Sequence, residues 1–195
     1  APAAAAPDEE APTINLELDA FNSNPSMLVV LRVIDVMADK FGDEWGFGPP
    51  NQPIRKSTVA PPKWVAGLCT KLTDTSAPVN SRLFVAKVII NLPRVFGPWG
   101  QDIICPLMEL AMTVEAPHGT QRGFHYLLRD LCYLFNEWPE AVPESTSAAD
   151  TATRFVNHLI AVTPSDRTVL WRSNLGCVSG LIKRWGHVIG IDKNP

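Results

Sequence analysis

The chain has 195 residues, of which 46% are apolar and 19% are charged, and this balance predicts a folded protein with a substantial core. Its 17 lysines and arginines against 20 aspartates and glutamates give a net charge of −3. That charge argues against a dedicated nucleic-acid module, whose affinity comes from many cations placed on phosphates. Direct DNA binding by this chain is therefore not expected.

The first 24 residues differ in composition from the rest. Residues 1 to 13 are alanine, proline and acid, with few large apolar groups to offset the entropy lost on ordering. We expect residues 1–24 to form a flexible linker and residues 25–195 to form one helical unit. We also expect residues 1–13 to be mobile. Because neither end of the chain carries a recognisable native signal, the chain is expected to be a piece of a longer protein.

The first predicted helix begins at Ser23-Asn24-Pro25, a capping residue followed by proline near the first helical position. Apolar residues follow at helical spacing: Met27, Leu28, Leu31, Ile34 and Met37. A loop rich in glycine and proline, residues 42–62, separates this helix from a second one over residues 62–73.

The segment of residues 79–92 is apolar around most of its circumference, so it is predicted to be a central helix packed on two or three sides. A strand is the alternative, because Val88, Ile89 and Ile90 are β-branched. The run is longer than a typical strand and its neighbours keep a 3.6-residue period, which favours the helix.

Pro93 and Gly97-Pro98 are predicted to stop that helix. Further helices are expected over residues 99–113, 122–138, 149–161 and 165–185, with Ser165 and Asp166 capping the last. In the last helix, the apolar face is read as Trp171, Leu175, Val178, Ile182 and Trp185. The helices group into pairs of roughly 36 to 47 residues, near the length of HEAT and armadillo repeats. The predicted fold is all-α, a HEAT/armadillo-like α-solenoid of about three helix pairs plus one extra N-terminal helix.

No enzymatic or metal-binding motif is evident in the sequence. The histidines, His118, His125, His158 and His187, lack partners at metal-ligand spacing. Nucleophile-elbow, phosphate-loop and kinase signatures are also missing. We expect no catalytic residue, no cofactor and no metal in this chain, so it is not interpreted as an enzyme.

The cysteines, Cys69, Cys105, Cys132 and Cys177, lie far apart inside apolar stretches. None is spaced for a zinc or redox site, and we interpret all as reduced core thiols of an intracellular protein. The longest apolar runs are too short to cross a bilayer, and no export signal precedes them. No membrane association is expected.

Two groups of cations are candidates for contact with a partner. Arg82 and Lys87 are the charges of the central helix, and the alternative is that they mark its water-facing edge. The last helix carries a modest basic face, for which solvation is again the alternative: Arg167, Arg172, Lys183 and Arg184. Among the tryptophans, Trp64, Trp138, Trp171 and Trp185 are expected in the core, whereas Trp45 and Trp99, beside glycines, are candidates for exposed anchors.

Three segments, residues 61–111, 123–138 and 154–191, match a known pattern in order and spacing. The matching points include Pro78-Val79-Asn80 before Arg82-Leu83-Phe84, then Val95-Phe96, His125-Tyr126 and Asn174-Leu175. In these points the chain resembles the PI3-kinase-related kinase family, and within it the catalytic subunits of DNA-dependent protein kinases, in the middle HEAT region called the NUC194 segment.

That resemblance implies a nuclear parent protein that binds DNA ends with the Ku heterodimer. It also implies that this parent phosphorylates serine and threonine in repair of double-strand breaks by non-homologous end joining. The kinase domain would lie elsewhere in the parent, and this segment would serve as scaffold, in contact with the rest of the parent chain. Two other hypotheses remain open: a HEAT/armadillo adaptor of nuclear transport or signalling, and a small helical enzyme.

Overall fold

The computed structural model describes residues 25–45, 54, 56–113, 121–162 and 170–189, and all regular structure within them is helical. The elements are α1 (Pro25–Trp45), α2 (Lys63–Thr73), α3 (Val79–Asn91), α4 (Pro93–Phe96), the 3₁₀ turn η1 (Gly97–Trp99), α5 (Gly100–Thr113), α6 (Gln121–Glu137), α7 (Thr146–Val162) and α8 (Leu170–Trp185). The all-α prediction is confirmed, and the strand alternative for residues 79–92 is wrong. The predicted linker, residues 1–24, lies outside the described residues, as do Ser165 and Asp166.

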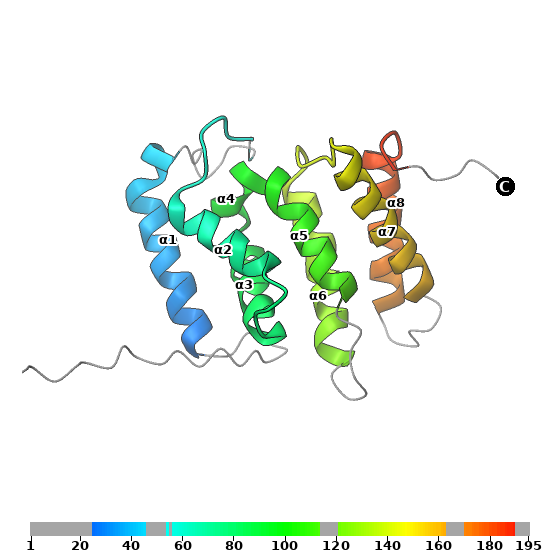
Figure 1. Cartoon of the computed structure of the whole chain (residues 1–195), viewed down its shortest axis with the longest axis horizontal. Coiled ribbons are helices and arrows are strands. Elements are labelled where there is room, and N and C mark those ends of the chain that lie inside the picture. The colour runs from blue at the N-terminus through cyan, green and yellow to red at the C-terminus, as the bar shows by residue number, and fades with distance from the viewer. Residues whose placement is uncertain (1–24, 46–53, 55, 114–120, 163–169, 190–195) are drawn as a thin grey trace, which may run out of the picture.

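The long helices form two layers and follow one another along the long axis of the molecule (Figure 1). One layer contains α2, α5 and α7, and the other contains α1, α3, α6 and α8, because neighbours within each of these rows are in contact. The consecutive pairs α2–α3, α5–α6 and α7–α8 also pack together, as the sequence predicts. The arrangement is solenoid-like, and α1 lies at one end of it with α3 as its main contact.

Helix α3 is the centre of the core. Its residues from Arg82 to Ile89 are all buried, and it contacts α1, α2, α4, α5 and α6. A helix surrounded in this way needs apolar residues on most of its circumference, which is the pattern that the sequence displays. The largest fully buried side chains of the core include Phe96, Phe135, Trp138 and Trp185.

The segment of residues 93–99 differs from its prediction. Pro93 does end α3, but it also occupies the first turn of α4, where its missing N–H costs no hydrogen bond. Trp99 is buried, and its indole N–H donates to the carbonyl of Val59 at 2.9 Å. The prediction that Trp99 is an exposed anchor is therefore wrong. The side chains of Trp45 and Trp171 lie outside the described residues.

Helix α8 uses a different inner face from the one predicted. Asn174, Cys177, Val178, Leu181 and Trp185 are buried, whereas Leu175 and Ile182 are 46% and 39% exposed. The predicted inner face is thus wrong at Leu175 and Ile182 and correct at Val178 and Trp185. This helix carries two apolar stripes. The one with Val178 and Leu181 is buried, and the one with Leu175 and Ile182 is exposed.

Candidate functional site

Arg82 and Lys87 lie inside the protein. Arg82 donates from Nε to the carbonyl of Leu72 at 2.9 Å, which satisfies a carbonyl in the last turn of α2. Lys87 pairs with Asp130 of α6, and its side chain is only 5% exposed. The prediction that these cations mark a water-facing edge is wrong, because their partners come from other helices. In this fold both side chains are buried and join helices.

The basic residues of α8 are accessible to different degrees. Arg172 and Lys183 are exposed, while Arg184 is half-buried against α6 and Arg167 lies outside the described residues. Arg184 donates to the carbonyl of Phe135 and, at 2.9 Å, to Oδ1 of Asn136. Burial lowers the pKa of the Arg184 guanidinium from its ordinary value. Guanidinium groups nevertheless stay protonated in proteins, and both of these acceptors are neutral, so the site keeps a full positive charge.

A groove of about 390 Å³ lies between α6 and α8. We call it the α6–α8 groove. Its lining residues include the two cations Arg129 and Arg184, the 64% exposed ring of Tyr133, and the glycines Gly176 and Gly180. No acidic side chain is among the described residues that line it. Of these residues, only Arg184 was a candidate from the sequence, although a pair of glycines four residues apart in a predicted helix is a signal for a bare helix face.

A disulfide forms part of the groove wall. Cys132 of α6 and Cys177 of α8 are bonded, with their Cα atoms 5.2 Å apart. The prediction of reduced thiols is wrong for these two residues. Their separation of 45 residues gave no sequence signal, because only the packing of α6 against α8 brings them together.

Cys69 and Cys105 are free thiols, as predicted. Burial is the main cause that raises the pKa of both, and the charges of Asp102 and Glu109 add to it for Cys69 and Cys105 respectively. A raised pKa keeps a thiol protonated and therefore a weak nucleophile. Neither residue has the electronic environment of a catalytic cysteine.

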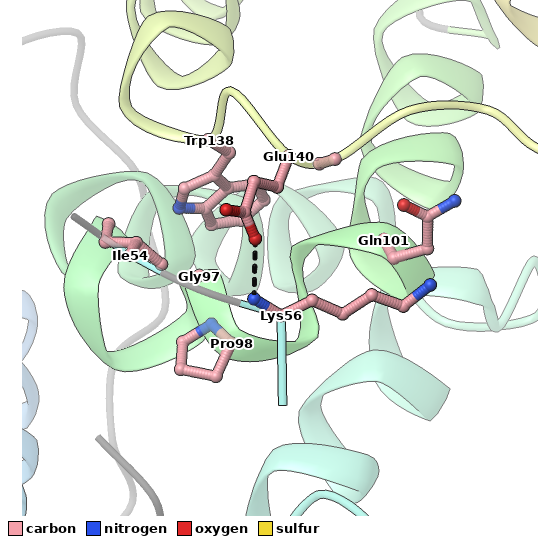
Figure 2. A pocket seen from close by; sticks show the side chains of 8 residues that line it. Ile54, Lys56, Gly97, Pro98, Gln101, Trp138 and Glu140 are labelled. Carbon is pink, nitrogen blue, oxygen red and sulfur yellow. Dashed lines mark hydrogen bonds between the residues drawn. The ribbon is translucent and has the colours of Figure 1, made fainter. Parts of the chain in front are cut away.

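A second, much smaller pocket lies where Ile54 and Lys56 meet Gly97 and Pro98 of η1 (Figure 2). The backbone N–H of Lys56 donates to the carboxylate of Glu140 at 3.1 Å, and the N–H of Ser57 donates to the carbonyl of Pro98 at 2.7 Å. On the far side, the indole N–H of Trp138 donates to the carbonyl of Pro93 at 2.7 Å. The cavity of about 10 Å³ is only large enough for one water molecule. This region fastens a connecting segment to the core and offers no ligand site.

Within the described part of the chain, no three His, Cys, Asp or Glu side chains are placed to hold a metal ion. No helix among the described residues is long and apolar enough to cross a membrane.

Comparison with known proteins gives a consistent result. The family model "DNA-dependent protein kinase catalytic subunit, CC3" matches residues 3–143. Among curated proteins, the DNA-dependent protein kinase catalytic subunit of Dictyostelium discoideum is 32% identical over 190 residues, or 92% of this chain. The mouse protein of the same name is 27% identical over 189 residues, or 91% of the chain, and that of Xenopus laevis is 26% identical over 132 residues, or 67%.

These relatives are far longer than the matched region. The chain spans 4% of the length of the Dictyostelium and mouse proteins and 3% of the Xenopus protein. No solved structure matches the chain significantly.

Proposed function

This chain belongs to the DNA-dependent protein kinase catalytic subunit family, and we propose that it forms a scaffold segment of such a protein, in which α1 packs against a further helix of the parent chain. The segment would carry no chemistry of its own. Its role would be to hold neighbouring parts of a long solenoid of HEAT type at a fixed spacing, with residues 25–195 as one structural unit.

The observation that carries this proposal is the outer surface of α1. Val29, Val33 and Val36 lie at positions i, i+4 and i+7, so they share one face of the helix. Their side chains are 62%, 52% and 49% exposed, while Met27 and Ile34 on the opposite face are buried. We call the three valines the α1 outer stripe. A helix that is apolar on two opposite sides is typical of the interior of a stack rather than of its end.

The layers support the same proposal. Each helix of the row α2, α5 and α7 packs against a helix of the other row, whereas the main contact of α1 among the described residues is α3, in its own row. In a solenoid, such a helix completes its pair with the preceding unit. Burying three half-exposed valines would contribute roughly 1 kcal/mol each, about half of the value for full burial.

For the parent protein we propose the activity that its relatives' name implies, phosphorylation dependent on DNA, with serine and threonine as the acceptors. We further propose that the parent acts in the nucleus in non-homologous end joining, with the Ku heterodimer and DNA ends as partners. This segment would take part through the rest of the parent chain. Family membership supports this scaffold reading over an adaptor of nuclear transport or signalling.

A triple substitution of the α1 outer stripe tests the scaffold proposal. Val29→Ser, Val33→Ser and Val36→Ser together should change the stability of the 195-residue chain little, because substitutions of exposed residues typically alter it by about 0.5 kcal/mol or less each. In the full-length parent, the same triple variant should open α1, seen as faster amide hydrogen exchange across Pro25–Trp45.

The control is Val88→Ser in α3, where the side chain is 1% exposed. This variant should destabilise the short chain and the parent alike, by about 1–3 kcal/mol, because it buries a hydroxyl in the core. If the triple variant leaves α1 exchange unchanged in the parent while Val88→Ser raises exchange, the stripe has no partner helix and the proposal fails.

A further inference from the structure

The α6–α8 groove has the properties of a recognition site rather than of a packing defect. It opens to solvent between two helices that are fixed relative to each other, because the Cys132–Cys177 disulfide joins its walls. A second tie is the pair of hydrogen bonds from Arg184 to α6. Because such a groove is formed before its ligand binds, ordering its side chains costs little of the binding free energy.

The charge of the groove selects the ligand. Arg129 and Arg184 lie at its walls, and none of the described residues that line it is acidic. Asp130 on the same helix pairs with both Lys87 and Arg129, while Arg184 donates to two neutral acceptors on α6. Exposed Lys183 and Arg172 on α8 extend the positive surface beyond the groove. This local excess stands out on a chain whose net charge is −3 and is complementary to an anionic ligand.

The shape of the groove favours a polypeptide over a nucleic-acid strand. Tyr133 presents a ring that is 64% exposed, a type of residue enriched at protein interfaces. On the facing wall, Gly176 and Gly180 lie one turn apart, and a Cβ at either position would meet nothing within 4 Å. The bare backbone of α8 therefore leaves room for the side chains of an incoming segment. Phe135 also lines the groove but is buried, and a single exposed aromatic ring does not provide the series of stacking platforms that bind single-stranded bases.

We propose that the α6–α8 groove docks an acidic peptide segment of a partner protein, with its carboxylates on Arg129 and Arg184 and an apolar side chain between Tyr133 and the glycines. The groove itself is the basis of this inference, so it does not depend on the scaffold role or on the identity of the parent protein.

The test is binding of a fluorescent 12-residue peptide of alternating glutamate and leucine to the full chain, measured by anisotropy. A second peptide with glutamine in place of each glutamate and a 12-nucleotide single-stranded DNA serve as competing probes. We expect the acidic peptide to bind, with affinity that falls as salt rises. The glutamine peptide should bind about fivefold more weakly, because two exposed charge pairs at about 0.5 kcal/mol each amount to about 1 kcal/mol.

Gly180→Leu is the decisive variant. The new side chain occupies open space in the groove, and leucine is a better helix former than glycine, so the melting temperature should stay the same or rise. Peptide binding should be lost. Gly67→Leu in α2 is the matched control, because Gly67 also has nothing within 4 Å of its Cβ position and lies outside the groove. That variant should bind as the unmodified chain does.

Three outcomes would overturn the proposal. The first is no measurable binding of the acidic peptide. The second is binding that Gly180→Leu leaves intact, which would show general attraction to a positive surface. The third is tighter binding of the DNA strand, lost in Gly180→Leu, which would make the groove a nucleic-acid site.

Discussion

Removing the disulfide between α6 and α8 should destabilise the chain strongly. The perturbation is the double variant Cys132→Ala and Cys177→Ala, or reduction of the unmodified chain by a thiol reagent. The cross-link closes a loop across a sequence separation of 45 residues. In the chain-entropy description of disulfides, a loop of this length contributes about 4 kcal/mol at 25 °C by restricting the unfolded chain.

For a chain of this size each kcal/mol shifts the melting temperature by about 2–4 °C, so a loss of about 8–16 °C is expected. Thermal unfolding followed by circular dichroism measures it, with and without reductant. The reductant should lower the melting temperature of the unmodified chain and leave that of the double alanine variant unchanged, because the variant has no bond to break.

Thiol titration of the denatured, unreduced chain provides the refutation. Two reactive thiols, Cys69 and Cys105, are expected. If four thiols react, the bond is absent and the stability argument built on it is wrong. The variant Cys69→Ala with Cys105→Ala is the control, since it should retain the dependence of melting temperature on reductant.

Three other substitutions test the packing of the chain. Gly100→Ala should destabilise the fold by about 1–2 kcal/mol, because the added Cβ would come 2.9 Å from Cε3 of the buried Trp138 ring. Gly67→Ala should stabilise the fold by about 0.5–1 kcal/mol, because Gly67 occupies an open helical position. Urea unfolding measures both changes, and equal effects would refute the close approach at Gly100. Asp130→Asn should lower the free energy of unfolding by about 3 kcal/mol or more, because it leaves the charge of Lys87 buried without a counter-ion. A decrease below about 1 kcal/mol in the same assay would show that the ion pair contributes little.

The helices could be predicted from the sequence because their causes are local. The unbroken apolar character of residues 79–92 requires burial on every side, and α3 is buried in that way. Prolines and glycines also placed most helix ends within a few residues, since their backbone constraints act at the positions where they occur. Pro93 was harder to interpret, because proline both ends one helix and suits the first turn of the next.

Burial of polar and aromatic groups could not be predicted, because it depends on partners distant in the chain. Arg82 and Lys87 were interpreted as partner contacts or as a water-facing edge, yet both are buried, where Arg82 donates to a carbonyl of α2 and Lys87 pairs with a carboxylate of α6. Trp99 is covered by a segment 40 residues earlier, whose Val59 carbonyl accepts its indole proton. The disulfide also depends on the packing of helices that are separated in sequence.

The groove was only partly visible in the sequence for a related reason. The basic residues of α8 were recognised, and Arg184 does line the groove. Its other wall comes from α6, and periodicity alone does not say which two helices will face each other. On α8 itself the sequence offered two apolar stripes, and the exposed one, with Leu175 and Ile182, was taken for the inner face.

The central claim is that this chain is an internal segment of a longer helical stack. The most direct measurement is the electron cryo-microscopy structure of the full-length parent protein. We predict that Val29, Val33 and Val36 of α1 lie in contact with another helix of the same polypeptide, outside any kinase domain. A map in which this face of α1 is open to solvent would contradict the claim.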